Sequence, residues 1–212
     1  MSAPIVADGT PEPSAPARRT PWWRHALNAL ALVAVLVVAG VVSHTAPTEA
    51  FWQSPVPVTG ALGEPVTGRN IQATVTRVRA AESVTASTGW TGETTGVWVV
   101  VDASVATVVT DYGTLLGTAQ LQIGDRVYSA SERPDYGTIA QKSLYTGIPS
   151  TGPLMFEVPR DILSDAAARD AQIQLAVDSD PRVDSLVVVP VDLTALPVEP
   201  SIETDEPSWG AP

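Results

Sequence analysis

The sequence contains no cysteine and only two histidines among its 212 residues. The lack of cysteine excludes disulfides, thiolate metal sites, a nucleophilic cysteine and a lipid attached to cysteine. His25 and His44 lie on either side of the longest apolar run, so the rest of the chain lacks the commonest general base and metal ligand at neutral pH. A Ser-His-Asp triad after His44 is therefore excluded, and a zinc hydrolase would need carboxylates alone.

Basic residues are also scarce. The chain has 12 Lys and Arg against 23 Asp and Glu, a net charge of −11, and Lys142 is the lone lysine. An acidic surface repels nucleic acid, so no nucleic-acid partner is expected. Heavy use of Ala and Val, with arginine in preference to lysine, is typical of a GC-rich bacterial genome, such as those of actinobacteria. No glycine-rich phosphate loop is present either, and we expect a protein that is not an enzyme and that holds no cofactor.

What the sequence does have is one long apolar run, Ala26 to Val42, without charge and with Asn28 as its only polar residue. Seventeen residues in a helix span about 26 Å, and the flanking residues bring the length close to that of a ~30 Å hydrocarbon core. A segment in lipid must satisfy its own backbone groups. The sequence therefore predicts one transmembrane helix over residues 25–45.

The residues that flank this run indicate its orientation. Three arginines precede it, and the next basic residue is Arg69, which by the positive-inside rule places residues 1–24 in the cytoplasm and the C-terminal part outside the cell membrane. Amphipathic aromatic rings favour the headgroup level. The predicted membrane-interface residues are Arg18, Arg19, Trp22, Trp23, Arg24, Phe51 and Trp52.

A cleaved signal peptide is the competing interpretation. Arg18-Arg19 resembles a weak twin-arginine signal, and Thr48-Glu49-Ala50 is a poor match to a cleavage site. The apolar run is slightly longer than the ~7–15 residues of a signal peptide. The anchor is the favoured interpretation, and cleavage stays open.

Proline and charge divide the remainder of the chain. Residues 1–24 are rich in Pro, Ala and Ser and are expected to be a disordered tail, because such a segment buries too little apolar surface to offset its ordering entropy. Residues 46–65 contain four prolines and predict a semi-extended linker. Residues 198–212 are acidic and Pro-rich, and a second disordered tail is expected there. One domain is then left, residues 66–197.

Period-two alternation within residues 66–197 predicts strands. The strongest is Val97 to Val105, whose first half is apolar enough for burial on both faces, and Gly124-Asp125 between two alternating runs predicts a hairpin. Only residues 161–170 suggest a short helix, and residues 80–96 and 131–150 suggest long loops. The expected fold is an all-β, antiparallel, immunoglobulin-like sandwich of about seven strands.

Four pieces occur in an order that resembles the telokin-like, immunoglobulin-like extracytoplasmic domain of Gram-positive and actinobacterial surface proteins, a family similar to the mycobacterial secreted immunogenic antigen. The pieces are Gly68–Ile71, Trp98–Ala103, Ile123–Tyr128 and Gly152–Pro159. The resemblance covers residues 68–193 and implies a β-sandwich without catalytic residues. Many such proteins are lipoproteins, a role that this chain's lack of cysteine does not allow.

Two sets of acidic residues are candidate sites, one for a metal ion and one for catalysis. Asp178, Asp180 and Asp184 could supply oxygen ligands to calcium, although a solvated turn fits them better because the segment has no glycine and contains Arg182. Glu157 with Asp161 is a weaker candidate for acid–base chemistry.

The aromatic residues within loops are the better candidates, because exposed aromatics anchor partners or stack on sugars. The candidate partner-binding residues are Trp90, Tyr112, Tyr136 and Tyr145. We expect a membrane-anchored binding or accessory module that contacts another envelope protein. The alternative is a surface protein that binds cell wall or carbohydrate through Trp90 and its neighbours.

Overall fold

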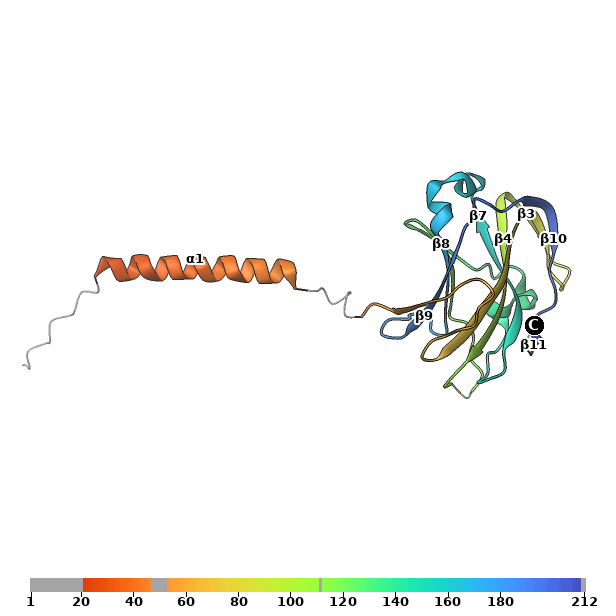
Figure 1. Ribbon diagram of the computed structural model, residues 1–212, viewed down its shortest axis with the longest axis horizontal. Coiled ribbons are helices and arrows are strands. Elements are labelled where there is room, and N and C mark those ends of the chain that lie inside the picture. The colour runs from red at the N-terminus through yellow and green to blue at the C-terminus, as the bar shows by residue number, and fades with distance from the viewer. Residues whose placement is uncertain (1–20, 47–52, 111, 211–212) are drawn as a thin grey trace, which may run out of the picture. The chain divides into compact units, whose positions relative to one another are not determined.

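The computed structural model describes residues 21–46, 53–110 and 112–210, in two units divided after Thr48. The first unit contains one helix, α1 (Trp22–Thr45) (Figure 1). It is long and apolar enough to cross a membrane, a property that membrane anchors and N-terminal signal sequences share. None of its residues is buried by protein. Trp22 and Trp23 lie in its first turn, with the Arg24 guanidinium 5.6 Å from the Trp23 ring centre.

Four of the predicted interface residues, Arg18, Arg19, Phe51 and Trp52, lie outside the described residues.

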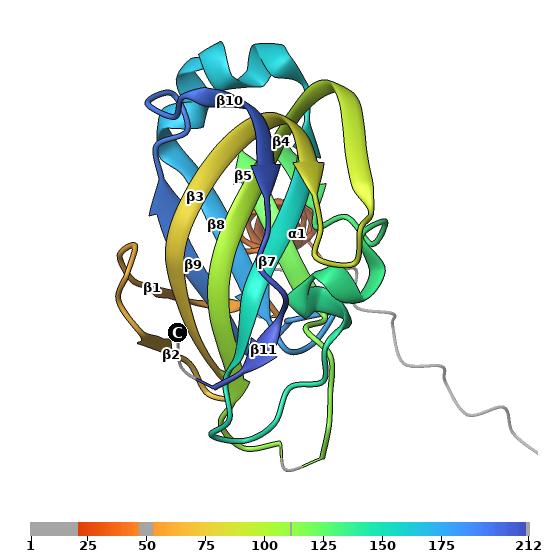
Figure 2. The same ribbon diagram turned by 90° about the vertical axis from the view of Figure 1, so that its right-hand side faces the viewer.

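The second unit is a sandwich of two sheets (Figure 2). In the order of pairing, the first sheet contains β1 (Val56–Thr59), β9 (Ser185–Val191), β8 (Ala171–Ala176), β5 (Thr118–Ile123) and β6 (Arg126–Ser129). The second contains β10 (Val198–Glu203), β3 (Ile71–Thr85), β4 (Thr91–Thr107), β7 (Ser150–Val158) and β11 (Ser208–Trp209), with β2 (Val66–Thr67) beside β3. The predicted all-β sandwich is confirmed. It has more strands than expected, and two pairs, β1 with β9 and β10 with β3, are parallel.

The main core lies between the sheets and takes alternate residues of their strands. From β4 it takes Val97, Val99 and Val101, and across the gap Ile173 and Leu175 of β8 are fully buried. Period-two alternation sends these side chains to one face and the residues between them to the other. The pattern read from the sequence therefore sets which face of each strand is buried.

A second apolar cluster covers the opposite face of the β3–β4–β7 sheet. Trp98 and Val100 of β4 and Met155 of β7 are fully buried there, and Ile202 of β10 is 2% exposed. The segment from β10 to β11 runs in front of β3, β4 and β7 in Figure 2, with Thr204 buried along it. This crossing segment buries the outward face of the middle of β4, so that Val97 to Val101 are buried on both faces as predicted.

The prediction of a disordered tail is wrong for residues 198–209. Their acidic side chains point to solvent from an added edge strand, while the backbone of β10 pairs with β3 and Ile202 enters the second cluster. Composition does not reveal this, because the pairing partner lies more than one hundred residues away in the chain. The linker prediction is also wrong for residues 56–59, where β1 joins the first sheet beside β9.

Three smaller expectations have different outcomes. The predicted hairpin is present, with β5 and β6 joined by Gly124-Asp125 and Gly124 at a φ of 57°. The predicted loop over residues 80–96 is mostly strand, because Ala81 and Val84 gain burial in the second cluster and β3 and β4 extend to a tight turn. The suggested helix over residues 161–170 lies within two 3-10 helices, η3 (Arg160–Ser164) and η4 (Ala166–Asp170).

The expected loop over residues 131–150 is irregular apart from two short 3-10 helices, η1 (Asp135–Gly137) and η2 (Ile139–Gln141).

Candidate functional site

One end of the sandwich gathers loops that are far apart in the sequence. The strands β3, β7 and β9 begin there and β4 and β8 end there, so residues 108–110, 112–117, 143–149 and 178–184 meet at this end. The backbone of the incoming chain also arrives here, because Val183 N donates to Gln53 O at 3.3 Å and β1 pairs with the start of β9. We call this end of the sandwich the tether end.

The tether end exposes several large apolar side chains. Tyr112 is 71% exposed, Val109 68%, Val183 63% and Trp209 62%. Val56, Val108, Leu115 and Ile148 are also exposed there. Single exposed apolar residues are ordinary on a protein surface, but a group of them indicates an interaction site.

Two aromatic rings form the centre of one side of this end. Tyr145 and Trp209 meet edge to face, with ring centres 5.8 Å apart at 84°. Gly113 lets the neighbouring loop lie on Tyr145, since a β-carbon at this position would come within 3.3 Å of the ring. Gly210 N donates to Pro149 O at 2.8 Å, which holds the C-terminal strand in place. We call Tyr112, Tyr145, Ile148 and Trp209 the aromatic cluster.

A hollow of about 230 Å³ lies beside Trp209, with Lys142 and Pro207 in its wall. Its size suits one side chain of a partner rather than a whole small ligand. Lys142 is the single lysine of the chain and is one of the residues that line this hollow. The cluster therefore combines an apolar surface, a depression and one positive charge.

The other side of the tether end contains the acidic turn, Asp178, Asp180 and Asp184, that was considered as a calcium site from the sequence. The Asp180 carboxylate pairs with Arg182, whose Nε lies 2.9 Å from each carboxylate oxygen. These hydrogen bonds hold the pKa of Asp180 below its ordinary value of 3.8. Asp184 accepts from its neighbour Ser185 N at 2.8 Å. Within the part of the chain that the structure describes, no three His, Cys, Asp or Glu side chains gather as a metal ion requires.

The four aromatic residues expected to bind a partner fall into two separate groups. Tyr112 and Tyr145 lie at the tether end. Trp90 and Tyr136 lie together elsewhere, because the turn between β3 and β4 contacts the segment before η1 through the Thr88 hydroxyl and Pro134 O, 3.5 Å apart.

Trp90 is half buried rather than free in a loop. Its ring meets Trp98 edge to face at 5.7 Å, and the Arg133 guanidinium lies 5.4 Å from the Trp90 ring centre and 5.6 Å from that of Trp98. Arg133 in turn donates to Glu157 at 3.1 Å. Packing in the second cluster thus explains this tryptophan, whereas Tyr136 is 62% exposed and its partner-binding role stays a prediction.

The acid pair Glu157 and Asp161 lines a hollow of about 540 Å³ with a mixed polar and apolar wall. Both carboxylate oxygens of Glu157 already accept hydrogen bonds, one from the Thr94 hydroxyl at 2.6 Å and one from Arg133 at 3.1 Å. A general acid or base needs a lone pair or a proton available to a substrate. This arrangement suits a structural ion pair better than catalysis.

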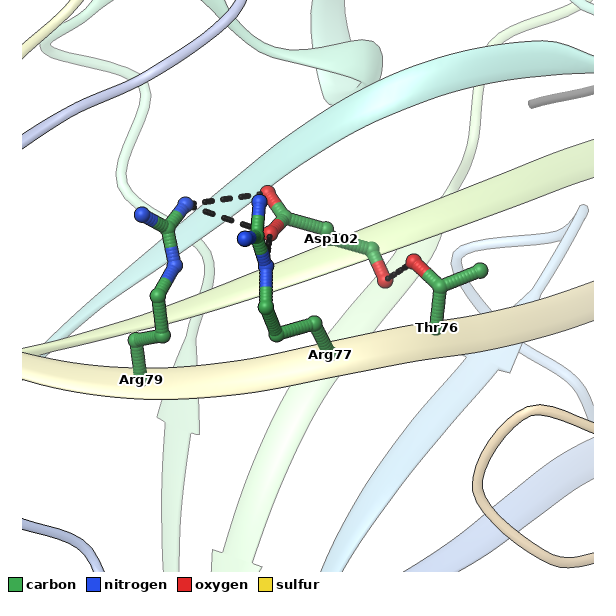
Figure 3. A network of polar contacts seen from close by, with 4 residues as sticks. All are labelled: Thr76, Arg77, Arg79 and Asp102. Atoms are coloured by element: carbon green, nitrogen blue, oxygen red, sulfur yellow. Dashed lines mark hydrogen bonds and ion pairs between the residues drawn. The ribbon is translucent and has the colours of Figure 1, made fainter.

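A second ionic group lies on β3 and β4 (Figure 3). The Asp102 carboxylate accepts from Arg77 Nε at 2.8 Å and from Arg79 at 3.1 Å, and its backbone oxygen accepts from the Thr76 hydroxyl at 3.0 Å. Asp102 and Arg79 are each about one-fifth exposed. The two guanidinium groups neutralise a carboxylate that lies on the same strand face as Trp98 and Val100, so the network has a structural role.

Sequence reasoning missed Val109, Val183 and Trp209. Trp209 belongs to the segment expected to be disordered, and no sequence pattern distinguishes the exposed valines from the many buried ones. Only the tertiary structure shows that the two valines lie where the chain joins the domain, because Val183 N donates to Gln53 O and Val109 lines the same hollow as Val183.

No family model matches this chain, and no curated protein matches it. Three solved structures are similar to it. An uncharacterized β-sandwich protein from Clostridium difficile 630 is 13% identical, with 68% of this chain and 99% of that chain covered and a TM-score of 0.46. The yjhA protein from Bacillus subtilis is 16% identical, with 61% of this chain and 98% of that chain covered and a TM-score of 0.42. A candidate lipoprotein from Staphylococcus aureus is 8% identical, with 68% of this chain and 97% of that chain covered and a TM-score of 0.42. Likeness at these levels assigns no function to this chain.

Proposed function

We propose that this protein is a non-catalytic, single-pass membrane protein whose extracytoplasmic β-sandwich binds another envelope protein. The observation that carries the proposal is the aromatic cluster at the tether end, where exposed rings lie beside a hollow the size of one side chain. Buried aromatic anchors dominate the binding energy of most protein interfaces. The occupied oxygens of Glu157 and the lack of histidine in the sandwich support a role without catalysis.

The proposed topology places the N-terminus in the cytoplasm and the sandwich outside the cell. The support is the arginines before α1, the apolar surface all around the helix and the tryptophans in its first turn. Retention of α1 in the mature protein is part of this proposal, and cleavage as a signal peptide is its alternative.

Membership of the telokin-like, immunoglobulin-like family of surface proteins is a further part of the proposal. Its support is that three of the four resembling pieces coincide with elements of the sandwich: Trp98–Ala103 with β4, Ile123–Tyr128 with the β5–β6 hairpin, and Gly152–Pro159 with β7 and the residue after it. An actinobacterial source remains an inference from composition.

The charge of the exported part limits the class of partner. Nine basic and 21 acidic residues follow α1, a formal charge of −12. A surface of this sign repels nucleic acid and favours a partner with a neutral or basic contact region. An integral membrane protein of the envelope with a neutral or basic contact region would lie within reach of an anchored domain.

Site-specific photo-crosslinking in intact cells tests the proposal. A photoreactive amino acid in place of Tyr112 or Trp209 should join the chain to one membrane protein in reproducible amounts, identified by mass spectrometry. The matched control is Val127, which is 52% exposed on β6 and lies outside the tether end. Equal products from Tyr112 and Val127 would contradict the proposal.

The same cells distinguish the cell-wall alternative. If wall-binding is the function, the chain should sediment with purified wall material, and Trp90→Ala should abolish this sedimentation. Since the Trp90 ring already contacts Trp98 and Arg133, we expect no such loss.

A further inference from the structure

A second part of the tether end, separate from the aromatic cluster, combines apolar side chains with charged side chains of both signs. Val109 and Val183, each more than 60% exposed, line a shallow hollow of about 360 Å³ with Arg69 and Arg182. We call these four residues the tether patch. Asp178 and Asp184 also line the hollow, and Asp180 pairs with Arg182 at 2.6 Å. Aliphatic side chains among charges of both signs suit the headgroup level of a zwitterionic membrane.

The structure holds Val109 firmly in its exposed position. The Asn70 side-chain oxygen accepts from Val109 N at 3.1 Å and from Thr110 N at 3.0 Å, and the Asn70 amide donates to the Thr110 hydroxyl at 2.8 Å. An apolar side chain presented by a fixed backbone loses little entropy on binding.

Val183 has an unusual backbone. Its φ is 57°, a left-handed conformation that is strained for a β-branched residue. Its N–H bonds to Gln53 O and its side chain is 63% exposed. Neither packing in the core nor backbone preference explains valine at this position, whereas a contact outside the domain does.

Chain length limits the distance between this patch and the end of α1. Six residues, 47–52, separate the end of the α1 segment at Ala46 from Gln53, and such a connection spans at most about 25 Å even when fully extended. Gln53 itself contacts Arg182 and Val183. The tether patch therefore lies where the connection enters the sandwich.

We propose that the tether patch lies on the outer headgroup layer of the bilayer and fixes the orientation of the sandwich on the membrane. This inference rests on the proposed anchor but not on the proposed protein partner. Docking through Val109 and Val183 leaves the separate aromatic cluster at membrane-proximal height, where an integral membrane partner could contact it.

Charge determines which lipid surface fits. Since the exported part carries a formal charge of −12, an anionic surface repels it as a whole, and this repulsion is screened by salt. Contact should therefore be strongest on zwitterionic lipid. On anionic lipid it should weaken, and added salt should restore it.

The cysteine-free chain allows a direct test with single labels. The full chain is reconstituted in phosphatidylcholine vesicles, and Val109→Cys or Val183→Cys carries an environment-sensitive fluorophore. The control label is at Ala166→Cys, an exposed residue of η4 at the opposite end of the sandwich. A nitroxide on the lipid headgroup should quench both patch labels several-fold more than the control.

A second variant separates lipid contact from folding. Val183→Asn suits a left-handed φ better than valine, so it should raise the melting temperature while it removes an apolar contact. With this substitution, headgroup quenching of the label at residue 109 should fall several-fold.

Quenching of both patch labels no stronger than that of the control would overturn the proposal. Shielding that grows with protein density in the vesicles and not with quencher would point to a second copy as the occupant, and would also overturn it. Failure to find a protein partner by crosslinking affects neither result, so the two proposals fail separately.

Discussion

Replacing Ile202 by alanine should destabilise the sandwich far more than its position near the end of an acidic, Pro-rich segment suggests. Ile202 is 2% exposed and packs in the second cluster with Trp98, Val100 and Met155. Truncation of a buried isoleucine removes its transfer free energy and leaves a cavity, at a cost of about 2–5 kcal/mol. We expect about 3 kcal/mol.

For a domain of this size, a loss of about 3 kcal/mol lowers the melting temperature by roughly 6–12 °C. The assay is thermal and urea unfolding of the full chain in detergent micelles, followed by tryptophan fluorescence, with Trp90 and Trp98 as the reporters within the cluster. The matched control is Val198→Ala on the same strand, where the side chain is 39% exposed. It should cost no more than about 1 kcal/mol.

Equal losses for the two substitutions would refute the reasoning. They would mean that residues 198–209 do not cover the outer face of the β3–β4–β7 sheet, and that the segment is a disordered tail after all.

Four further predictions follow from the described contacts. Asp102→Ala removes the carboxylate that Arg77 and Arg79 share, and Arg79 is only one-fifth exposed, so the substitution should lower the unfolding free energy by about 1–3 kcal/mol in urea titration. Asp102→Asn keeps a neutral hydrogen-bonding side chain at this position and should cost less. Arg182→Gln should raise the pKa of Asp180 toward 3.8, as measured by NMR titration of the carboxyl carbon. Because the pKa of Asp180 is lower in the folded than in the unfolded chain, the ion pair stabilises the fold above the unfolded pKa. This stabilisation is lost as the pH falls through the folded pKa. Millimolar calcium should leave the melting temperature unchanged, since Arg182 occupies Asp180, and a clear rise would revive the calcium site. Trp90→Ala should lower the melting temperature by removing its packing on Trp98, whereas a binding defect with unchanged stability would show that the residue serves a partner instead.

The features that the sequence predicted are those with a local cause. An uncharged run of seventeen residues has no stable backbone conformation in lipid except a helix, whichever residues follow it. Alternation from Val97 to Val105 sends side chains to opposite faces wherever the strand is placed. The Gly124-Asp125 turn likewise depends on a φ that glycine adopts without cost.

What the sequence could not reveal depends on contacts between distant residues. Whether residues 198–209 are ordered is decided by β3 and β7, to which they add strands at opposite edges of one sheet.

The candidate site has the same origin. Tyr145 and Trp209 are 64 positions apart, and Val183 meets Gln53 across the parallel pairing of β1 with β9. Composition and periodicity describe each residue with its neighbours in the chain, so they determine the helix, the strands and their buried faces. The tertiary structure alone decides which exposed residues share a surface, because that depends on which strand ends the sheet topology brings together.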